Sequence, residues 1–296
     1  MRLADCHSRE AIKGYAFVLP WMIGFLSFTL IPVAMSLYYS LCDYSLLQPP
    51  VYRGLENYRM LMSDEVFLKA LVKTFNYAAF SIPLGLIVAL AAALLLNNDI
   101  RCRSVYRTIV FLPSLVPTVA AAMIWLWLFN NKLGLVNLAL TKLGVDKPPG
   151  WLADEHWAMP ALVIMSVWGI GNTIVIYLAG LQDVPRELYE AADIDGAGAG
   201  RKVWHVTLPT LSPVIFFNLI MALIGSMQVF VLPYIMTQGG PARSTYFFTY
   251  YLYDNAFVYL KMGYASAMAW IQLLIVLTLT AIAFWSSKHW VHHAGR

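Results

Sequence analysis

The polar side chains within the apolar stretches of this sequence are mostly uncharged hydroxyls and amides. They are Ser114, Thr118, Ser166, Asn172, Thr173, Tyr177, Asn218, Ser226, Gln228, Tyr234 and Gln272, and Trp125, Trp127, Trp168 and Trp270 occur among them. A sugar offers hydroxyls along its edge and a C–H face that stacks on an aromatic ring, so these residue types suit a sugar without an ionic bond. The alternative is structural, because Ser, Thr and Asn in membrane helices also bond to neighbouring helices, and Trp and Tyr gather at membrane interfaces.

The sequence contains no group of residues whose types and spacing are typical of a catalytic or metal-binding site. The apolar runs within 108–181 and 211–236 hold no ionisable residue in mid-run, whereas secondary transporters usually need such relays. His156 and His205 are expected on opposite sides of the membrane, and Cys6, Cys42 and Cys102 lie far apart. We therefore expect no catalytic or metal-binding residues, which disfavours an intramembrane transferase. No Gly-x-x-x-x-Gly-Lys-Ser/Thr loop occurs either, so any ATP would be bound by another subunit.

Helices that cross a bilayer must hold these side chains. Of 296 residues, 60% are hydrophobic and 12% charged, with a mean hydropathy of +0.64, whereas about a quarter of a soluble chain is charged. Runs long enough to span hydrocarbon, about six in all, are centred on 15–41, 72–96, 108–129, 158–181, 211–236 and 263–286. The sequence predicts an all-α membrane protein surrounded by the lipid bilayer. The small excess of 20 Lys and Arg over 16 Asp and Glu gives no indication of nucleic-acid binding.

The spans divide the chain into five expected segments. They are an N-terminal segment at 1–14, a first transmembrane helix at 15–41, an extracytoplasmic loop at 42–71, a core of five spans at 72–286 and a tail at 287–296. An even number of spans places both termini on one side, and the shorter, cation-richer connections on that side favour the cytoplasm.

Prolines and glycines interrupt the expected spans. They are Pro83, Pro113, Pro117, Pro160, Pro213 and Pro233, with Gly169, Gly171, Gly180 and Gly225. Broken helices are tolerated where they line a cavity inside a bundle, although both residue types are also more frequent in membrane helices generally. The set predicts a bundle with an interior path.

A polar loop at 182–209 separates the fourth and fifth spans on the cytoplasmic side. Pro185 suits the first turn of a helix, 186–195 is predicted to be a short helix, and Gly196 is its expected stop. One face of this helix is mostly small and apolar, which lets another surface approach closely. That face consists of Leu188, Ala191, Ala192 and Asp195. A basic turn at 201–206 follows, and Pro209 is expected to open the next span.

The loop resembles the EAA loop of permease subunits of binding-protein-dependent ABC importers. The resemblance rests on Glu190-Ala191-Ala192, Gly196 and Leu208-Pro209, and 189–197 (YEAADIDGA) is similar to the form found in carbohydrate importers. Further similarity to the maltose (MalF) and glycerol-phosphate (UgpA) type lies at 54–58 (GLENY), at 106–107 (YR) with 111–113 (FLP) and Pro117, and at 237–241 (TQGGP).

This resemblance implies a type I ABC importer permease fold in a bacterial cytoplasmic (inner) membrane, with cytoplasmic termini. It also implies a second, MalG-like permease, two ATPase subunits that bind ATP and Mg, and an extracytoplasmic solute-binding protein. The EAA loop is then the coupling helix that docks on the ATPase. The residues implied in coupling are Glu190, Ala191, Ala192, Asp195, Gly196 and Trp204. Gly198, Ala199 and Gly200 stand where relatives carry a docking aromatic, so that aromatic is either missing from this chain or supplied by Trp204.

The resemblance also implies a substrate path built from three spans. Its positions in this chain are Ser114, Thr118, Trp168, Gly169, Asn172, Ser226 and Val229, with Gln228 beside them. The implied substrate is a carbohydrate, first an oligosaccharide, acidic ones included. Glycerol phosphate or its diesters come second because no buried Arg is expected in the path. A secondary transporter is a weaker alternative, since it would call for buried charges or an internal repeat.

Overall fold

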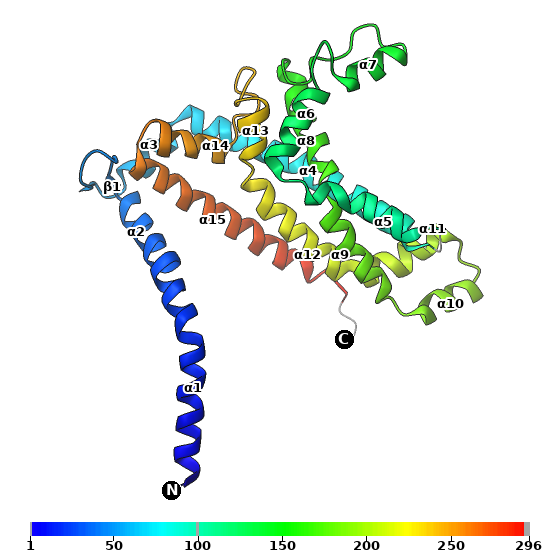
Figure 1. Cartoon of the computed structure of the whole chain (residues 1–296), viewed down its shortest axis with the longest axis horizontal. Helices are drawn as coiled ribbons and strands as arrows, with labels where there is room; N and C mark the ends of the chain where they lie inside the picture. Colours follow the sequence, from blue (N-terminus) through cyan, green and yellow to red (C-terminus); the bar gives the residue numbers. More distant parts are fainter. Residues whose placement is uncertain (1, 99–100, 293–296) are drawn as a thin grey trace. The chain divides into compact units, whose positions relative to one another are not determined.

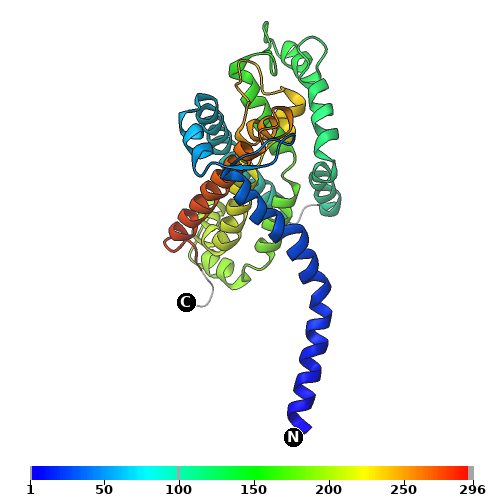
Figure 2. The same cartoon turned by 90° about the vertical axis from the view of Figure 1, so that its left-hand side faces the viewer.

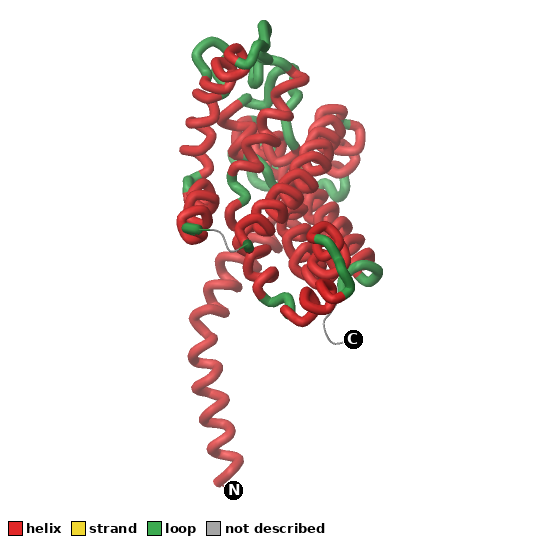
Figure 3. Tube along the Cα trace, turned by 90° about the vertical axis from the view of Figure 1, so that its right-hand side faces the viewer, coloured by secondary structure: helices red, strands yellow, loops and turns green. Residues whose placement is uncertain are grey.

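The computed structural model describes residues 2–98 and 101–292, and in these ranges most of the chain is helical (Figure 1, Figure 3). The described residues fall into two compact units, one formed by 2–64 with 252–271 and the other by 65–251 with 272–292. The strands β1 (Cys42–Asp43) and β2 (Val51–Tyr52) form one antiparallel pair, in which Cys42 lies opposite Tyr52.

The first unit contains one long N-terminal helical run. This run consists of α1 (Arg2–Phe25), a π-helical turn at Leu26–Leu30 and α2 (Ile31–Ser40) (Figure 2). The helix thus begins well before the predicted start of the first span at residue 15. Its part Gly14–Ser40 has a mean hydropathy of 1.9, and none of the most apolar window is buried within the chain. Such a surface requires lipid or another protein around it. The other helices of this unit are α3 (Glu56–Ser63), the π-helical turn Asp254–Val258 and the first part of α15 (Met262–Ser287).

The second unit is built around α4 (Glu65–Asn97). The remaining helices of this unit are α5 (Arg103–Phe111), α6 (Thr118–Leu128), α7 (Leu135–Lys142), α8 (Glu155–Trp168), α9 (Gly171–Gln182), α10 (Arg186–Ile194), α11 (Ala199–Lys202), α12 (Leu208–Met227), α13 (Val231–Met236), α14 (Phe248–Tyr253) and the rest of α15. Helix α4 packs against α8, α9 and α12. Its small residues Ala89 and Ala93 are completely buried, and such residues allow helices in membranes to approach closely.

The number of candidate transmembrane spans agrees with the sequence prediction, and several of these spans are bent or broken. Among the described residues, four helical runs are long and apolar enough to cross a membrane, and two bent pairs raise the number to six if each pair is one span. The predicted span 108–129 is bent by 98°, between 103–115 and α6. The bend falls at Val116–Pro117, where a 3₁₀ turn (Leu112–Leu115) ends and the backbone becomes extended. Pro117 has no N–H to continue a helix.

Two further predicted spans are interrupted. The span 158–181 bends by 47° between α8 and α9, at Gly169 and Ile170. The span 211–236 stops at Met227, and α13 begins only at Val231. Prolines and glycines were expected to interrupt the spans, and the structure shows where two of these interruptions lie. The breaks lie at the positions predicted to line the substrate path, which agrees with the expectation that irregular backbone lines a cavity.

The start of the fifth span also differs from the prediction. Pro209 does not open it, because the helical run already begins at Ala199 and continues to Met227. The turn Val203–Thr207, directly before the proline, is a wider π-helical turn. Pro209 follows it in the first turn of α12, where a residue without an N–H fits the start of a regular helical segment.

Candidate functional site: the elbow and the broken spans

The first candidate site is the elbow, which we define as α10, α11 and the turn between them. Helix α10 begins after Pro185 and ends at Ile194, and Asp195 is its C-cap. Gly196 has a φ of +71°, a conformation that costs little only for glycine. The Gly196 N–H donates to the Asp193 carbonyl at 3.0 Å, and the Ala197 N–H donates to the Ala192 carbonyl at 2.9 Å. These bonds close the end of α10 and turn the chain back, which confirms the predicted helix and its stop.

Two side-chain contacts connect α10 to the helical run that follows Gly196. Lys202 on α11 forms an ion pair with Asp193 on α10. The Tyr189 hydroxyl lies 2.9 Å from the Thr207 hydroxyl, and Thr207 is almost completely buried. Each contact joins a residue before Gly196 to a residue after it. Together they restrict the angle between α10 and the helical run that follows.

The elbow presents an apolar stripe to its surroundings. Leu188 is 43% exposed and Ile194 is 88% exposed, and Ala191 lies exposed between them at helical spacing. Ile194 is a residue that our sequence interpretation did not single out, although its spacing from Leu188 and Ala191 gave the signal. Trp204, the predicted replacement for the docking aromatic, is 69% exposed and lies on the π-helical turn beyond α11. Glu190 is also exposed.

The second candidate site is a cavity of about 240 Å³ between α4, α8, α9 and α12. Two of the predicted path residues, Ser226 and Val229, line it together with Ser166 and Thr173. The Ser226 hydroxyl donates to the Leu223 carbonyl at 2.9 Å, and the Ser166 hydroxyl donates to the Val163 carbonyl at 2.7 Å. The Ser226 oxygen therefore keeps its lone pairs as acceptors for a ligand that donates.

The other predicted path residues lie around the two bent spans. Ser114 lies in the 3₁₀ turn and donates to the Phe111 carbonyl at 2.7 Å. It lies directly against Gly171, since a Cβ on that glycine would be 2.8 Å from the Ser114 hydroxyl oxygen. The Trp168 ring meets the Trp125 ring edge-on, with centroids 6.1 Å apart.

The remaining path residues are not gathered into the 240 Å³ cavity. Thr118, Gly169, Asn172 and Gln228 are exposed, and Gln228 is the C-cap of α12. The structure thus brings Ser226 and Val229 into one cavity and places Ser114 beside the α8–α9 break. It does not bring all eight predicted residues into one pocket.

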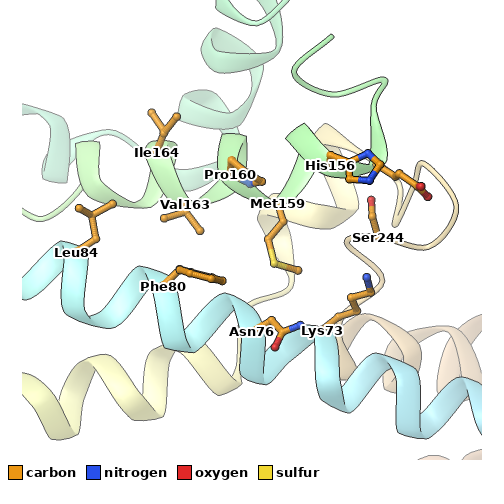
Figure 4. A pocket seen from close by; sticks show the side chains of 11 residues that line it. Lys73, Asn76, Phe80, Leu84, His156, Met159, Pro160, Val163, Ile164 and Ser244 are labelled. Atoms are coloured by element: carbon orange, nitrogen blue, oxygen red, sulfur yellow. The ribbon is translucent and has the colours of Figure 1, made fainter. Parts of the chain in front are cut away.

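A larger cavity of about 560 Å³ lies between α4 and α8 (Figure 4). Lys73, His156 and Ser244 lie at one end, whereas Phe80 and Leu84 extend along the other part. Asn76 and Glu155 are further polar lining residues. Our sequence interpretation missed this cavity, because Lys73 and His156 lie toward the N-terminal ends of α4 and α8 and belong to no motif. The only earlier signal was the helical spacing of 73, 76, 80 and 84.

The start of α8 is fixed beside this cavity. The Asp154 carboxylate accepts a hydrogen bond from the His156 N–H at 2.8 Å and caps the helix. That bond to the ionised form lowers the pKa of Asp154. Among the described residues, no group of three or more His, Cys, Asp or Glu side chains is placed to hold a metal ion.

Comparison with known proteins assigns this arrangement to a family. Residues 81–292 match the family described as "Binding-protein-dependent transport system inner membrane component". The chain belongs to this family. The permease is 40% identical over 292 residues to "Probable ABC transporter permease protein YesP" of Bacillus subtilis, covering 97% of this chain and 94% of the relative. It is 35% identical over 281 residues to "Trehalose/maltose transport system permease protein MalF" of Thermococcus litoralis, covering 93% of each.

The permease also resembles solved structures in fold. One is described as "a bacterial ABC transporter involved in the import of the acidic polysaccharide alginate"; the TM-score is 0.84, the identity 24%, and the match covers 98% of this chain and 99% of that one. The expected all-α fold of a type I ABC importer permease is thereby confirmed. The roles of the individual coupling and path residues stay predictions.

Proposed function

We propose that this permease forms, together with a second MalG-like permease, the translocation path of a carbohydrate importer. The elbow carries the proposal, because a short rigid helix with an exposed apolar stripe is suited to docking on ATPase subunits. Three relatives with sugars in their names support the substrate class: the MalF protein above, "Arabinooligosaccharides transport system permease protein AraP" and "Lactose transport system permease protein LacF". A partner shifts an equilibrium only through its different interaction with two states, so this contact would transmit ATPase closure to the path.

In the elbow, each predicted coupling residue has a proposed part. Ala191 and Ala192 allow close approach, and Leu188 and Ile194 fill apolar hollows of the ATPase cleft. Glu190 is free to pair with a base in that cleft, and charge-assisted bonds are the stronger kind. Asp195 and Gly196 set the turn, and Trp204 packs at the rim of the contact.

The substrate that we propose is an oligosaccharide, with an acidic one favoured. The support is a group of basic residues near the start of α4: Lys73 lines the 560 Å³ cavity, which the acidic Glu155 also lines, and Lys73 and Arg243 line a neighbouring cavity of about 220 Å³ together with Lys69, which pairs with Glu65. Cations in such cavities attract carboxylates. Glycerol phosphate or its diesters are the second candidate. The neutral residues of the broken spans would then receive the sugar hydroxyls deeper in the path.

We further propose that the permease is a multi-pass protein of the bacterial inner membrane with cytoplasmic termini. In this arrangement the solute-binding protein docks on the extracytoplasmic side. ATP and Mg are held by the two ATPase subunits, and the permease itself catalyses nothing. The exposed run Gly14–Ser40 would then face lipid or the second permease.

The purified permease alone is expected neither to hydrolyse ATP nor to transport, because it has no phosphate-binding loop. The complex with second permease, ATPase pair and solute-binding protein should hydrolyse ATP faster with the correct sugar. The measurement is ATPase activity in vesicles over a panel of neutral oligosaccharides, uronic-acid oligosaccharides and glycerol phosphates. Sugar-stimulated hydrolysis by the permease without a co-purified ATPase would refute the proposal, and stimulation by glycerol phosphates alone would select the second substrate.

Replacing Asn172 with leucine is expected to raise the half-saturating sugar concentration of transport without loss of assembly. A sugar hydroxyl left without its partner costs about 1–3 kcal/mol, which is about tenfold in affinity in the upper half of this range. The matched control is Thr278→Val, because Thr278 is an exposed polar residue of α15 whose hydroxyl donates to the Leu274 carbonyl of its own helix. Equal half-saturation in the wild type and Asn172→Leu would mean that Asn172 does not line the path.

A further inference from the structure

An unpaired arginine lies inside a cavity between α5 and α9. This cavity has a volume of about 230 Å³ and is lined by Arg107 of α5, Leu96 at the end of α4 and Gln182 at the end of α9. The Nε and Nη2 atoms of Arg107 are buried, and neither has a hydrogen-bond partner among the described residues. Buried donors of a charged group without a partner are costly. The described residues supply no acceptor for these two atoms, so a ligand with an anionic group would satisfy them.

The walls of this cavity are apolar apart from Arg107 and Gln182. Val110, Phe111, Ile174, Val175 and Leu178 form them. On the outward face of α9, Val175, Ala179 and Gln182 are exposed, so the lining continues onto the surface of that helix. The occupant must combine an anionic group with an apolar body.

Helix α5 itself has the form of a helix that lies at a membrane surface. Val105, Ile109 and Leu112 are 56%, 59% and 58% exposed and follow one another at helical spacing. Arg103 and Arg107 lie one turn apart on another face, and Arg101 precedes the helix and is exposed. A helix with one apolar and one basic face binds at the boundary between headgroups and acyl chains of anionic membranes. The 98° bend before α6 separates its direction from that of the following span.

We propose that the cavity binds the phosphate of an anionic phospholipid. The forked guanidinium of Arg107 donates two bonds to the phosphate, and the apolar walls hold the start of an acyl chain. The location in the inner leaflet rests on the orientation proposed above, whereas lipid binding itself does not. Because Gln182 lies only a few residues before the elbow, the lipid would stabilise the base of the coupling helix.

The test uses a photoactivatable phosphatidylglycerol with the purified full-length chain and with the assembled importer. We expect it to label peptides of α5 and α9, and to label Arg107→Met at least about tenfold less. Arg101→Met is the matched control, because it removes the same charge from an exposed position nearby; its labelling should fall by less than about fivefold, the value of one surface charge. Phosphatidylcholine carrying the same photoactivatable group should not label the cavity, and millimolar inorganic phosphate should not compete.

A second measurement does not depend on labelling. Phosphatidylglycerol should raise the thermal unfolding midpoint of the wild type but not that of Arg107→Met, because a ligand stabilises only the state that binds it. Arg107→Met should still fold, since it removes the unpaired donors. Equal labelling of the wild type and Arg107→Met would overturn the proposal. Competition from inorganic phosphate would also overturn it. So would loss of labelling when the importer is assembled, because that result would indicate that a carboxylate of a partner subunit binds Arg107.

Discussion

Gly196→Val is expected to abolish coupled transport while leaving the membrane-spanning part folded. Gly196 has a φ of +71°, and a β-branched residue held there stores strain of about 1–3 kcal/mol. A Cβ at Gly196 would meet no atom within 4 Å, so the strain comes from the backbone alone. A change in the angle between α10 and α11 would release it and, under the proposed function, would displace Leu188 and Ile194 from the docking contact.

The measurement is pull-down of the ATPase subunits together with transport and hydrolysis rates in reconstituted vesicles. We expect transport by Gly196→Val to fall by at least about tenfold, the equivalent of about 1.4 kcal/mol in the docking equilibrium. Gly196→Asn is the matched variant at the same position, because asparagine tolerates the left-handed region; it should keep most of the activity. Gly200→Ala controls for a side chain within α11, where a Cβ also meets nothing within 4 Å. Wild-type values for Gly196→Val in all three assays would exclude the elbow as the transmission element.

The elbow could be predicted from the sequence because its signals are local. Pro185 and Gly196 mark the two ends of α10 through backbone properties that act within one turn. The number of spans could be predicted for a similar reason, since it depends on the length and hydropathy of each run. The orientation of α10 toward a partner depends on which side chains stay exposed. Ile194 was therefore recognised only in the structure.

The breaks within the spans could not be located from the sequence. Pro113, Pro117 and Pro160 all interrupt apolar runs, yet α8 contains Pro160 without the large bend found at Pro117. Which proline bends a helix depends on the neighbouring helices that replace its lost hydrogen bond. The cavities at Lys73 and Arg107 were missed for the same reason, because each needs residues from at least two helices that are distant in sequence.

The structure gives a physical explanation for the motif at 54–58, which the sequence analysis noted only as a family resemblance. Asn57 is buried, and its side-chain amide donates to the carbonyls of Ser40 and Cys42, each at 2.9 Å. The Tyr58 hydroxyl donates to the Ser40 hydroxyl at 2.8 Å. These bonds fasten α3 to the end of α2. The motif therefore has a structural role in the first unit, whereas the sequence alone suggested no role.

Gly263→Ala is expected to destabilise this same part of the first unit more than any ordinary glycine substitution in a helix. Gly263 is the second residue of α15, and its N–H donates to the Tyr44 carbonyl at 3.0 Å. A Cβ there would overlap the Cys42 carbonyl oxygen and would lie 3.1 Å from the Tyr39 carbonyl oxygen. Helix propensity alone would favour alanine by about 1 kcal/mol. Overpacking costs about 1–3 kcal/mol. Because the obstructing atoms here belong to the backbone, we expect this steric cost to exceed the gain in helix propensity.

The measurement is the thermal unfolding midpoint of the purified chain in detergent, with limited proteolysis of the 41–64 segment as a local readout. Gly263→Ala should lower the midpoint by several degrees and expose the segment to protease, since about 1 kcal/mol corresponds to about 2–4 °C for chains of this size class. Gly24→Ala in α1 is the matched control, because a Cβ there meets no atom within 4 Å, and it should be neutral or stabilising. An unchanged midpoint and unchanged cleavage in Gly263→Ala would show that the segment can move away from α15 at little cost. The backbone contact would then not be what positions the 41–64 segment.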